Sequence, residues 1–153
     1  MIDTPEIVEV PVQTTASLAM VVPASEIMHH MGPGIQEVYR ALADQGIEPA
    51  GPWFTHHFRR PSETFDFEIC VPVKDDVTPQ GRVRPGVLPA HRAVRTIYHG
   101  GYHGLGNGWG EFMRWIEDQG LKVRDDLWEA YVIGPDSAAR AEDYETQLNK
   151  PLA

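Results

Sequence analysis

The stretch Asp44-Gln45-Gly46-Ile47 recurs later in the chain as Asp118-Gln119-Gly120-Leu121, and this recurrence decides the fold. Each copy follows a segment whose apolar residues recur at helical spacing. A glycine directly after such a segment is a common helix stop, because glycine readily adopts a left-handed backbone. The two copies therefore predict two amphipathic helices that end in the same way.

The hydrophobic stripes before the two copies are also in register. At the same offset, three apolar residues of the first helix align with three of the second: Ile35, Val38 and Leu42 with Trp109, Phe112 and Ile116. With a few residues of slack, Val71-Pro72-Val73 aligns with Lys150-Pro151-Leu152. An internal repeat is therefore predicted, over about residues 5–75 and 83–153.

Runs rich in β-branched and aromatic residues surround both helices and predict strands. We expect strands over residues 6–22, with Pro11 at an edge or bulge, and over 53–58, 65–73, 87–98, 126–135 and 146–152. A short helix over 24–31 is expected to break or kink at Gly32-Pro33-Gly34, and a polar connector is expected over 136–144. The order strand, helix, strand, strand thus occurs twice, which predicts a pseudo-symmetric α+β domain with a ligand cleft between its halves.

The composition excludes several classes of protein. A formal charge of −9 over 153 residues, with no local cluster of Lys and Arg, argues against nucleic-acid binding. No apolar run reaches the length of a membrane span, and the N-terminus lacks the features of a signal peptide. We therefore expect a cytoplasmic protein with no membrane association.

No metal or cofactor is expected. The seven histidines show no HExxH or comparable spacing, and the single cysteine, Cys70, lies in an apolar run typical of a core position. The glycine-rich stretch 100–110 contains neither a GxGxxG nor a GK[ST] pattern, so it predicts a helix entry and not a phosphate loop.

The strand over 126–135 contains one acid in an otherwise bulky and apolar run. Glu129 shares a face with Leu127 and Tyr131, while Trp128 and Ala130 lie on the other. A buried carboxylate is costly unless something pairs with it. Glu129 is therefore either a solvated or ion-paired structural residue, or the acidic group at the floor of an aromatic pocket.

Aromatic residues that could line such a pocket lie on several predicted elements. They can bind flat or cationic molecules by stacking and cation–π contact, although most could equally be core residues. The candidate ligand-binding residues are Glu129, Tyr131, Tyr98, Tyr102, Trp53, His57, Tyr39, Trp109 and Phe67.

The chain resembles the GyrI-like small-molecule-binding domain, also called the AraC-type effector-binding domain. The resemblance rests on residues 46–52, 65–73, 98–105, 128–135 and 146–152, which include Tyr98-His99-Gly100-Gly101 and Trp128-Glu129-Ala130-Tyr131. It implies one domain over residues 1–153 made of two βαββ units of the SHS2 type with pseudo-two-fold symmetry, an antiparallel sheet, two main helices and a central ligand cleft. It also implies that Glu129 is the acidic residue of that cleft and that His57 stands where many members have tyrosine.

The resemblance leaves three functions open. The first is a stand-alone binding protein for aromatic or cationic drug-like molecules, since the first strand begins close to Met1. The second is a hydrolase of strained cyclopropane-bearing toxins, in which Glu129 acts with the hydroxyl of Tyr98 or Tyr102. The third is a gyrase-inhibitor-like module whose partner is a protein, either a regulator or gyrase.

Overall fold

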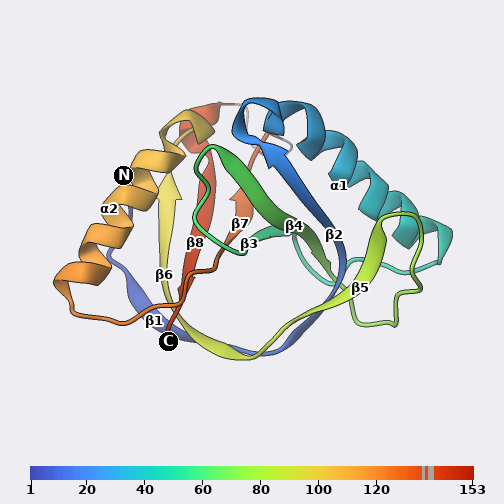
Figure 1. Cartoon of the computed structure of the whole chain (residues 1–153), viewed down its shortest axis with the longest axis horizontal. Helices are drawn as coiled ribbons and strands as arrows, with labels where there is room; N and C mark the ends of the chain where they lie inside the picture. Colours follow the sequence, from blue (N-terminus) through green and yellow to red (C-terminus); the bar gives the residue numbers. More distant parts are fainter. Residues whose placement is uncertain (136, 138–139) are drawn as a thin grey trace. The chain divides into compact units, whose positions relative to one another are not determined.

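The computed structural model describes residues 1–135, 137 and 140–153, and it divides into two compact units. Unit 1 comprises Met1–Val10 and His91–Ala153, and unit 2 comprises Pro11–Ala90. Each unit contains four antiparallel strands and one main helix (Figure 1). The α+β class with two main helices is thereby confirmed. In the connector predicted over 136–144, residues 136, 138 and 139 lie outside the described residues.

Unit 2 is a sheet with the strand order β3-β4-β2-β5. Its elements in chain order are β2 (Gln13–Pro23), the 3-10 turn η1 (Ala24–Glu26), α1 (Ile27–Asp44), β3 (Phe54–His57), β4 (Thr64–Pro72) and β5 (Val83–Leu88). Strand β2 alternates between α1-facing residues such as Leu18 and residues of the other face such as Ser17, as a strand of period two must.

Unit 1 has the strand order β1-β6-β8-β7. Its elements are β1 (Glu6–Val10), β6 (His91–His99), the 3-10 turn η2 (Tyr102–Gly104), α2 (Leu105–Asp118), β7 (Leu127–Ile133), the 3-10 turn η3 (Ala141–Asp143) and β8 (Glu145–Pro151). The two units therefore have the same order of elements. A helix follows a long strand (β2 or β6), and two antiparallel strands follow the helix.

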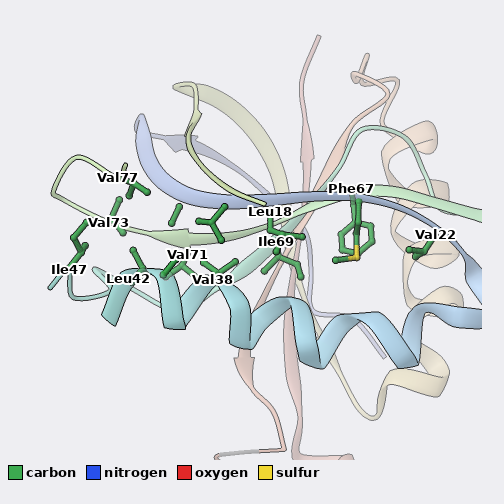
Figure 2. Close-up of a cluster of buried hydrophobic side chains, with 14 residues drawn as sticks. Leu18, Val22, Val38, Leu42, Ile47, Phe67, Ile69, Val71, Val73 and Val77 are labelled. Carbon is green, nitrogen blue, oxygen red and sulfur yellow. The ribbon is translucent and has the colours of Figure 1, made fainter. Parts of the chain in front are cut away.

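The core of unit 2 lies between α1 and its sheet, as Figure 2 shows. Val38 and Leu42 of the predicted helical stripe are almost completely buried against Leu18, Ile69 and Val71 of the strands. In unit 1 the equivalent stripe residues Trp109, Phe112 and Ile116 pack with Val94, Leu127 and Leu148. Both helices are thus fixed by burial of one apolar stripe, which contributes more to helix stability than intrinsic propensity does.

The two helices end with the same backbone conformation. Gly46 and Gly120 both have φ of 68°, the left-handed conformation that glycine adopts without strain. In the first helix the amide of Ile47 donates to the carbonyl of Leu42, and in the second Leu121 donates to Ile116. Both ends are therefore Schellman caps, and the repeated Asp-Gln-Gly stretch encodes them.

A second glycine pair repeats in the packing of helix against strand. A Cβ atom added to Gly34 would meet Met20 and Ile69, and one added to Gly108 would lie 2.6 Å from Tyr98 Cδ1. Gly34 and Gly108 are separated by the same offset as Gly46 and Gly120. Each helix therefore packs closely against its sheet at a glycine: Gly34 lies against Ile69 of β4 and Met20 of β2, and Gly108 lies against Tyr98 of β6.

We expect Gly108→Ala to destabilise the protein by about 1–3 kcal/mol, because the new methyl group overlaps the buried ring of Tyr98. Gly106→Ala on the same helix is the matched control, since nothing lies within 4 Å of its Cβ position. The control should be neutral or stabilising by up to about 1 kcal/mol, because alanine favours helix. Chemical denaturation of both variants measures the difference; equal stabilities would contradict the close approach.

Two predicted boundaries are wrong. The runs 6–22 and 87–98 were each expected as one strand, but the first divides into β1 and β2 near Pro11, and the second divides at Pro89 into the end of β5 and the strand β6, which begins at His91. At each division the chain passes to the other unit, since β1 pairs with β6 and β5 with β2. Proline lacks the amide that would continue a ladder, so each division falls where a strand cannot be extended.

Gly32-Pro33-Gly34 does not end the first helix, because α1 runs from Ile27 to Asp44 with Pro33 inside it. The residue before a proline is normally driven out of the helical region by its own Cβ, and Gly32 has none. No helix in the described part of the chain combines the length and hydrophobicity needed to cross a membrane.

Candidate functional site

Strand β7 presents Leu127, Glu129 and Tyr131 to the face of the unit 1 sheet that α2 covers. In the ladder with β8, Glu129 lies opposite Leu148, and Leu148 packs in the core beneath α2. The strand alternation predicted from the sequence is therefore confirmed for this stretch. The acid lies between a strand and a helix and not on an outer surface.

Both carboxylate oxygens of Glu129 accept a hydrogen bond from an aromatic residue. The indole Nε1 of Trp109 donates to Oε2 at 2.5 Å, and the hydroxyl of Tyr131 donates to Oε1 at 2.7 Å. Trp109 comes from the buried stripe of α2, which is why it reaches the strand. Glu129 is 7% exposed, so these bonds replace its water.

The electrostatics of Glu129 are unusual for a buried acid. Burial raises the pKa of its carboxyl above the ordinary value, while the bonds from Tyr131 and Trp109 act in the opposite direction. Among the described residues, no basic side chain forms an ion pair with it. Among the described residues, the partners of this buried carboxyl are thus two neutral donors, and a cation beside it would stabilise its charged form.

Tyrosine rings continue from Glu129 toward the surface. Tyr131 meets Tyr102 edge-on, with ring centroids 6.0 Å apart, and Tyr102 meets Tyr144 at 5.2 Å. Tyr102 is 40% exposed, so this row links the buried acid to solvent. Tyr144 was not predicted as a site residue, because it lies in a polar connector with no periodicity to mark it.

Tyr98 packs against the glycine-rich turn that precedes α2. Its hydroxyl donates to the carbonyl of Gly101 at 2.9 Å, and its ring lies against Gly104 and Gly108. With 5% exposure, the side chain fastens the glycine-rich turn that leads into α2. The hydroxyl within hydrogen-bonding distance of Glu129 is that of Tyr131 and not that of Tyr98.

The other four candidate residues belong to unit 2. Phe67 is completely buried in the core, and Tyr39 and Trp53 pack partly buried against it. His57 stacks on Phe67 with centroids 5.1 Å apart and planes 18° apart, and its Nε2 lies 3.1 Å from Thr55 Oγ1. Their role in ligand binding stays a prediction.

The repeat relates the polar residues of the two units. At the offset that joins Gly46 to Gly120, Thr55 aligns with Glu129 and His57 aligns with Tyr131. The strand pairing agrees, because Thr55 lies opposite Ile69 as Glu129 lies opposite Leu148. Unit 2 thus has an uncharged pair, Thr55 and His57, where unit 1 has an acid and a phenol.

Two hollows on the surface lie away from the carboxylate. One of about 450 Å³ at the end of α1 is lined by residues that include Tyr39 and Gly46, and one of about 580 Å³ lies beside Gly100 and His103. Glu129 lines neither of them and is covered by its own aromatic neighbours. The described residues contain no cluster of three or more His, Cys, Asp or Glu side chains that could bind a metal ion.

The model of the GyrI-like small molecule binding domain matches residues 3–152, nearly the whole chain. The chain belongs to the GyrI-like family. No curated protein matches it. This membership confirms the resemblance found in the sequence and assigns the chain to a family of small-molecule-binding domains.

Solved structures similar to this chain include EcmrR. Its C-terminal domain is 26% identical with a TM-score of 0.87, and the match covers 98% of this chain and 97% of that one. The EcmrR chain in a cryo-EM complex with DNA is 27% identical with a TM-score of 0.86; the match covers 97% of this chain, which spans 57% of that one.

More distant likenesses show the fold alone. A hydrolase from Listeria innocua is 14% identical, with a TM-score of 0.64 and coverage of 97% of this chain and 91% of that one. SAV2435, solved bound to tetraphenylphosphonium, is 12% identical with a TM-score of 0.66, and the match covers 99% of this chain and 94% of that one.

Proposed function

We propose that this GyrI-like domain binds small amphipathic cations with an aromatic body, and that Glu129 is the residue that recognises their charge. The observation that carries the proposal is a single buried carboxylate bonded by Trp109 and Tyr131 and unpaired with any basic side chain of the described residues. A lipophilic cation supplies the missing charge and loses less hydration on burial than a small inorganic ion does.

The aromatic neighbours favour the same class of ligand. The faces of aromatic rings attract cations, and the attraction grows when water is excluded. Tyr131, Tyr102 and Tyr144 form a continuous row between Glu129 and the surface. A cation entering along this row contacts ring faces before it reaches the carboxylate, so rings and acid act on the same ligand.

A second candidate function is hydrolysis at the same residues. A carboxyl whose pKa is raised by burial suits general acid–base catalysis, and the hydroxyl of Tyr131 lies 2.7 Å from Glu129 Oε1. In this version Glu129 and Tyr131 act together on an electrophilic ligand. An interaction module with a protein such as gyrase is the third candidate, and the net charge of −9 is the feature that supports it.

Two related probes test the choice. Tetraphenylphosphonium is a large aromatic cation, and triphenylphosphine oxide is an uncharged molecule built from the same rings. We expect calorimetric titration to show saturable binding of the cation and much weaker binding of the oxide. Incubation with electrophilic aromatic compounds followed by mass spectrometry tests hydrolysis. Turnover of an electrophilic compound would support the hydrolase and contradict the binding proposal. If neither probe binds and no turnover is seen, the protein-interaction module is the function that remains.

Cation binding should also strengthen as pH rises. A proton and the cation compete for Glu129, and its raised pKa moves this competition above the ordinary range of a carboxylic acid. In that window binding displaces the proton. Titration at one pH in two buffers with different ionisation enthalpies measures the protons released. Equal apparent enthalpies in both buffers, with an affinity independent of pH, would contradict the assignment of Glu129 as the cation's partner.

A further inference from the structure

The face of the unit 1 sheet opposite α2 contains a row of polar side chains that the cation site does not use. Arg95 of β6, Asn149 of β8 and Trp128 of β7 are direct neighbours across three strands. Glu129 and Tyr131 alternate with Trp128 along β7, so they point to the other face. Whatever this row binds is therefore independent of the proposed cation site.

A network of hydrogen bonds fixes the guanidinium of Arg95. Its Nε donates to Asn149 Oδ1 at 2.6 Å, and the amide nitrogen of Asn149 donates to Gln147 Oε1 at 3.1 Å. Asn149 is completely buried, so it cannot turn toward water. The guanidinium also lies over the ring of Trp128, 5.6 Å from its centroid. The hydrogen bond to Asn149 and the contact with the Trp128 ring therefore hold the guanidinium in one orientation.

The donors at the end of this network have no acceptor within the described part of the chain. Of the nitrogens of Arg95 only Nε is bonded, and the side-chain nitrogen of Gln147 donates to none of the described residues. Burial lowers the pKa of Arg95, while the carboxylate of Glu6 on the neighbouring strand acts in the opposite direction without forming an ion pair. The half-buried guanidinium is still charged at neutral pH, and it has lost part of its hydration.

We propose that Arg95 and Gln147 form a second binding site, which takes the carboxylate of a small monocarboxylic acid with an apolar body. The two terminal nitrogens of a guanidinium match the two oxygens of a carboxylate in a bidentate pair. Gln147 adds an amide donor beside them. In the strand pairing the half-buried Ile97 lies beside Gln147, so the apolar body of the acid lies over this side chain.

The charge around the row favours a monoanion over a phosphate. One guanidinium neutralises one negative charge, and the exposed Glu6 directly across from Arg95 repels a second. The chain as a whole has a formal charge of −9, which further disfavours a dianion. Benzoate is therefore the probe, with benzyl alcohol as its uncharged analogue and inorganic phosphate as the alternative anion.

The site can be tested by nitrogen-15 NMR at constant ionic strength, in which chloride replaces the probe anion. Benzoate should shift the side-chain resonances of Arg95, Trp128 and Gln147 saturably, with a dissociation constant on the order of 1 mM. Benzyl alcohol and phosphate should not saturate below about 50 mM. Equal saturation by phosphate and benzoate would overturn the proposal, and so would the absence of saturation by benzoate.

Matched variants separate the site from general charge effects. Arg95→Gln should weaken benzoate at least about tenfold, whereas Arg92→Gln, an exposed arginine on the same strand, should leave the constant within about twofold. Gln147→Leu should weaken benzoate even if Arg95→Gln fails to fold, and Glu6→Gln should strengthen it. Benzoate affinity unchanged in Gln147→Leu and Glu6→Gln would overturn the assignment. Gln147→Leu and Glu6→Gln leave Glu129 unchanged. Titration of these two variants with tetraphenylphosphonium therefore tests the cation site separately from the benzoate site.

Discussion

Replacing Glu129 with glutamine is expected to weaken the binding of tetraphenylphosphonium by about 1–3 kcal/mol, the scale of losing a charge-assisted partner. The wild-type carboxylate is buried and, within the part of the chain that the structure describes, bonded only by the neutral donors Trp109 and Tyr131, so a cation placed beside it stabilises its charge. The amide keeps the shape and removes the charge. Uncharged aromatic ligands should lose much less, because their contacts with the rings survive the change.

Glutamine can be accommodated without an unpaired polar group. Its carbonyl oxygen can accept the bond from Trp109, and its amide can donate to the hydroxyl of Tyr131, which serves as donor or acceptor. A loss of affinity in Glu129→Gln therefore reports the charge and not a collapsed site. Tyr131→Phe is the complementary variant: it keeps a ring at the same position and removes one donor to Glu129 Oε1.

The two variants also separate binding from hydrolysis. If Glu129 is a catalytic acid or base, Glu129→Gln should abolish turnover while binding of the substrate remains nearly intact. Calorimetry and a turnover assay on the same samples distinguish the outcomes. If Glu129→Gln matches the wild type in both assays, Glu129 neither recognises the cation nor takes part in catalysis.

Local patterns predicted much of the fold because both helices and most strands obey short-range rules. The Asp-Gln-Gly stretches become caps at Gly46 and Gly120, and the stripes that contain Val38 and Phe112 become buried faces. The pairing partners of β1 and β5 could not be predicted in this way. A strand's periodicity specifies which of its faces is buried, but it does not specify which other strand it pairs with.

The sequence singled out some residues of the candidate site and not others. Glu129 stood out because a single acid in an apolar strand requires an explanation, and Trp109 lay on a helical stripe that faces a strand. Tyr98 bonds to Gly101, and Tyr144, which the sequence did not single out, joins the tyrosine row. Which of several tyrosines reaches an acid depends on turns such as 100–104 and 134–144, whose conformation has no periodic signature.

The second large effect is expected at His57, which should make the protein less stable as pH falls from neutrality toward 4. Burial, with the adjacent His56 in support, lowers the pKa of His57 from 6.5 to about 4. In the unfolded chain the imidazole takes up a proton near pH 6.5, whereas in the folded protein it does so only near pH 4. Between these values the unfolded state binds more protons, so stability rises with pH and is fully present above 6.5.

The difference between the two pKa values corresponds to about 3 kcal/mol. The physical cause is the environment of the ring: His57 is 3% exposed, stacks on Phe67, and has an Nδ1 without a hydrogen-bond partner within the described structure. A protonated ring needs an acceptor at each nitrogen, and only Nε2 has a neighbour, Thr55 Oγ1.

Denaturant unfolding from pH 4 to 8 for the wild type and His57→Gln measures this effect. Other carboxylates titrate in the same range, so the informative quantity is the difference between the two free energies of unfolding at each pH. That difference should increase in favour of the wild type by about 3 kcal/mol between pH 4 and 7. His103→Gln, a change at an exposed histidine of unit 1, should follow the wild-type curve throughout.

A difference for His57→Gln that does not vary with pH would mean that His57 protonates as easily in the folded protein as in the unfolded chain. The pair of Thr55 and His57, which aligns with Glu129 and Tyr131 of unit 1, would then be accessible to water. His57 would in that case have no effect on how the stability of unit 2 depends on pH.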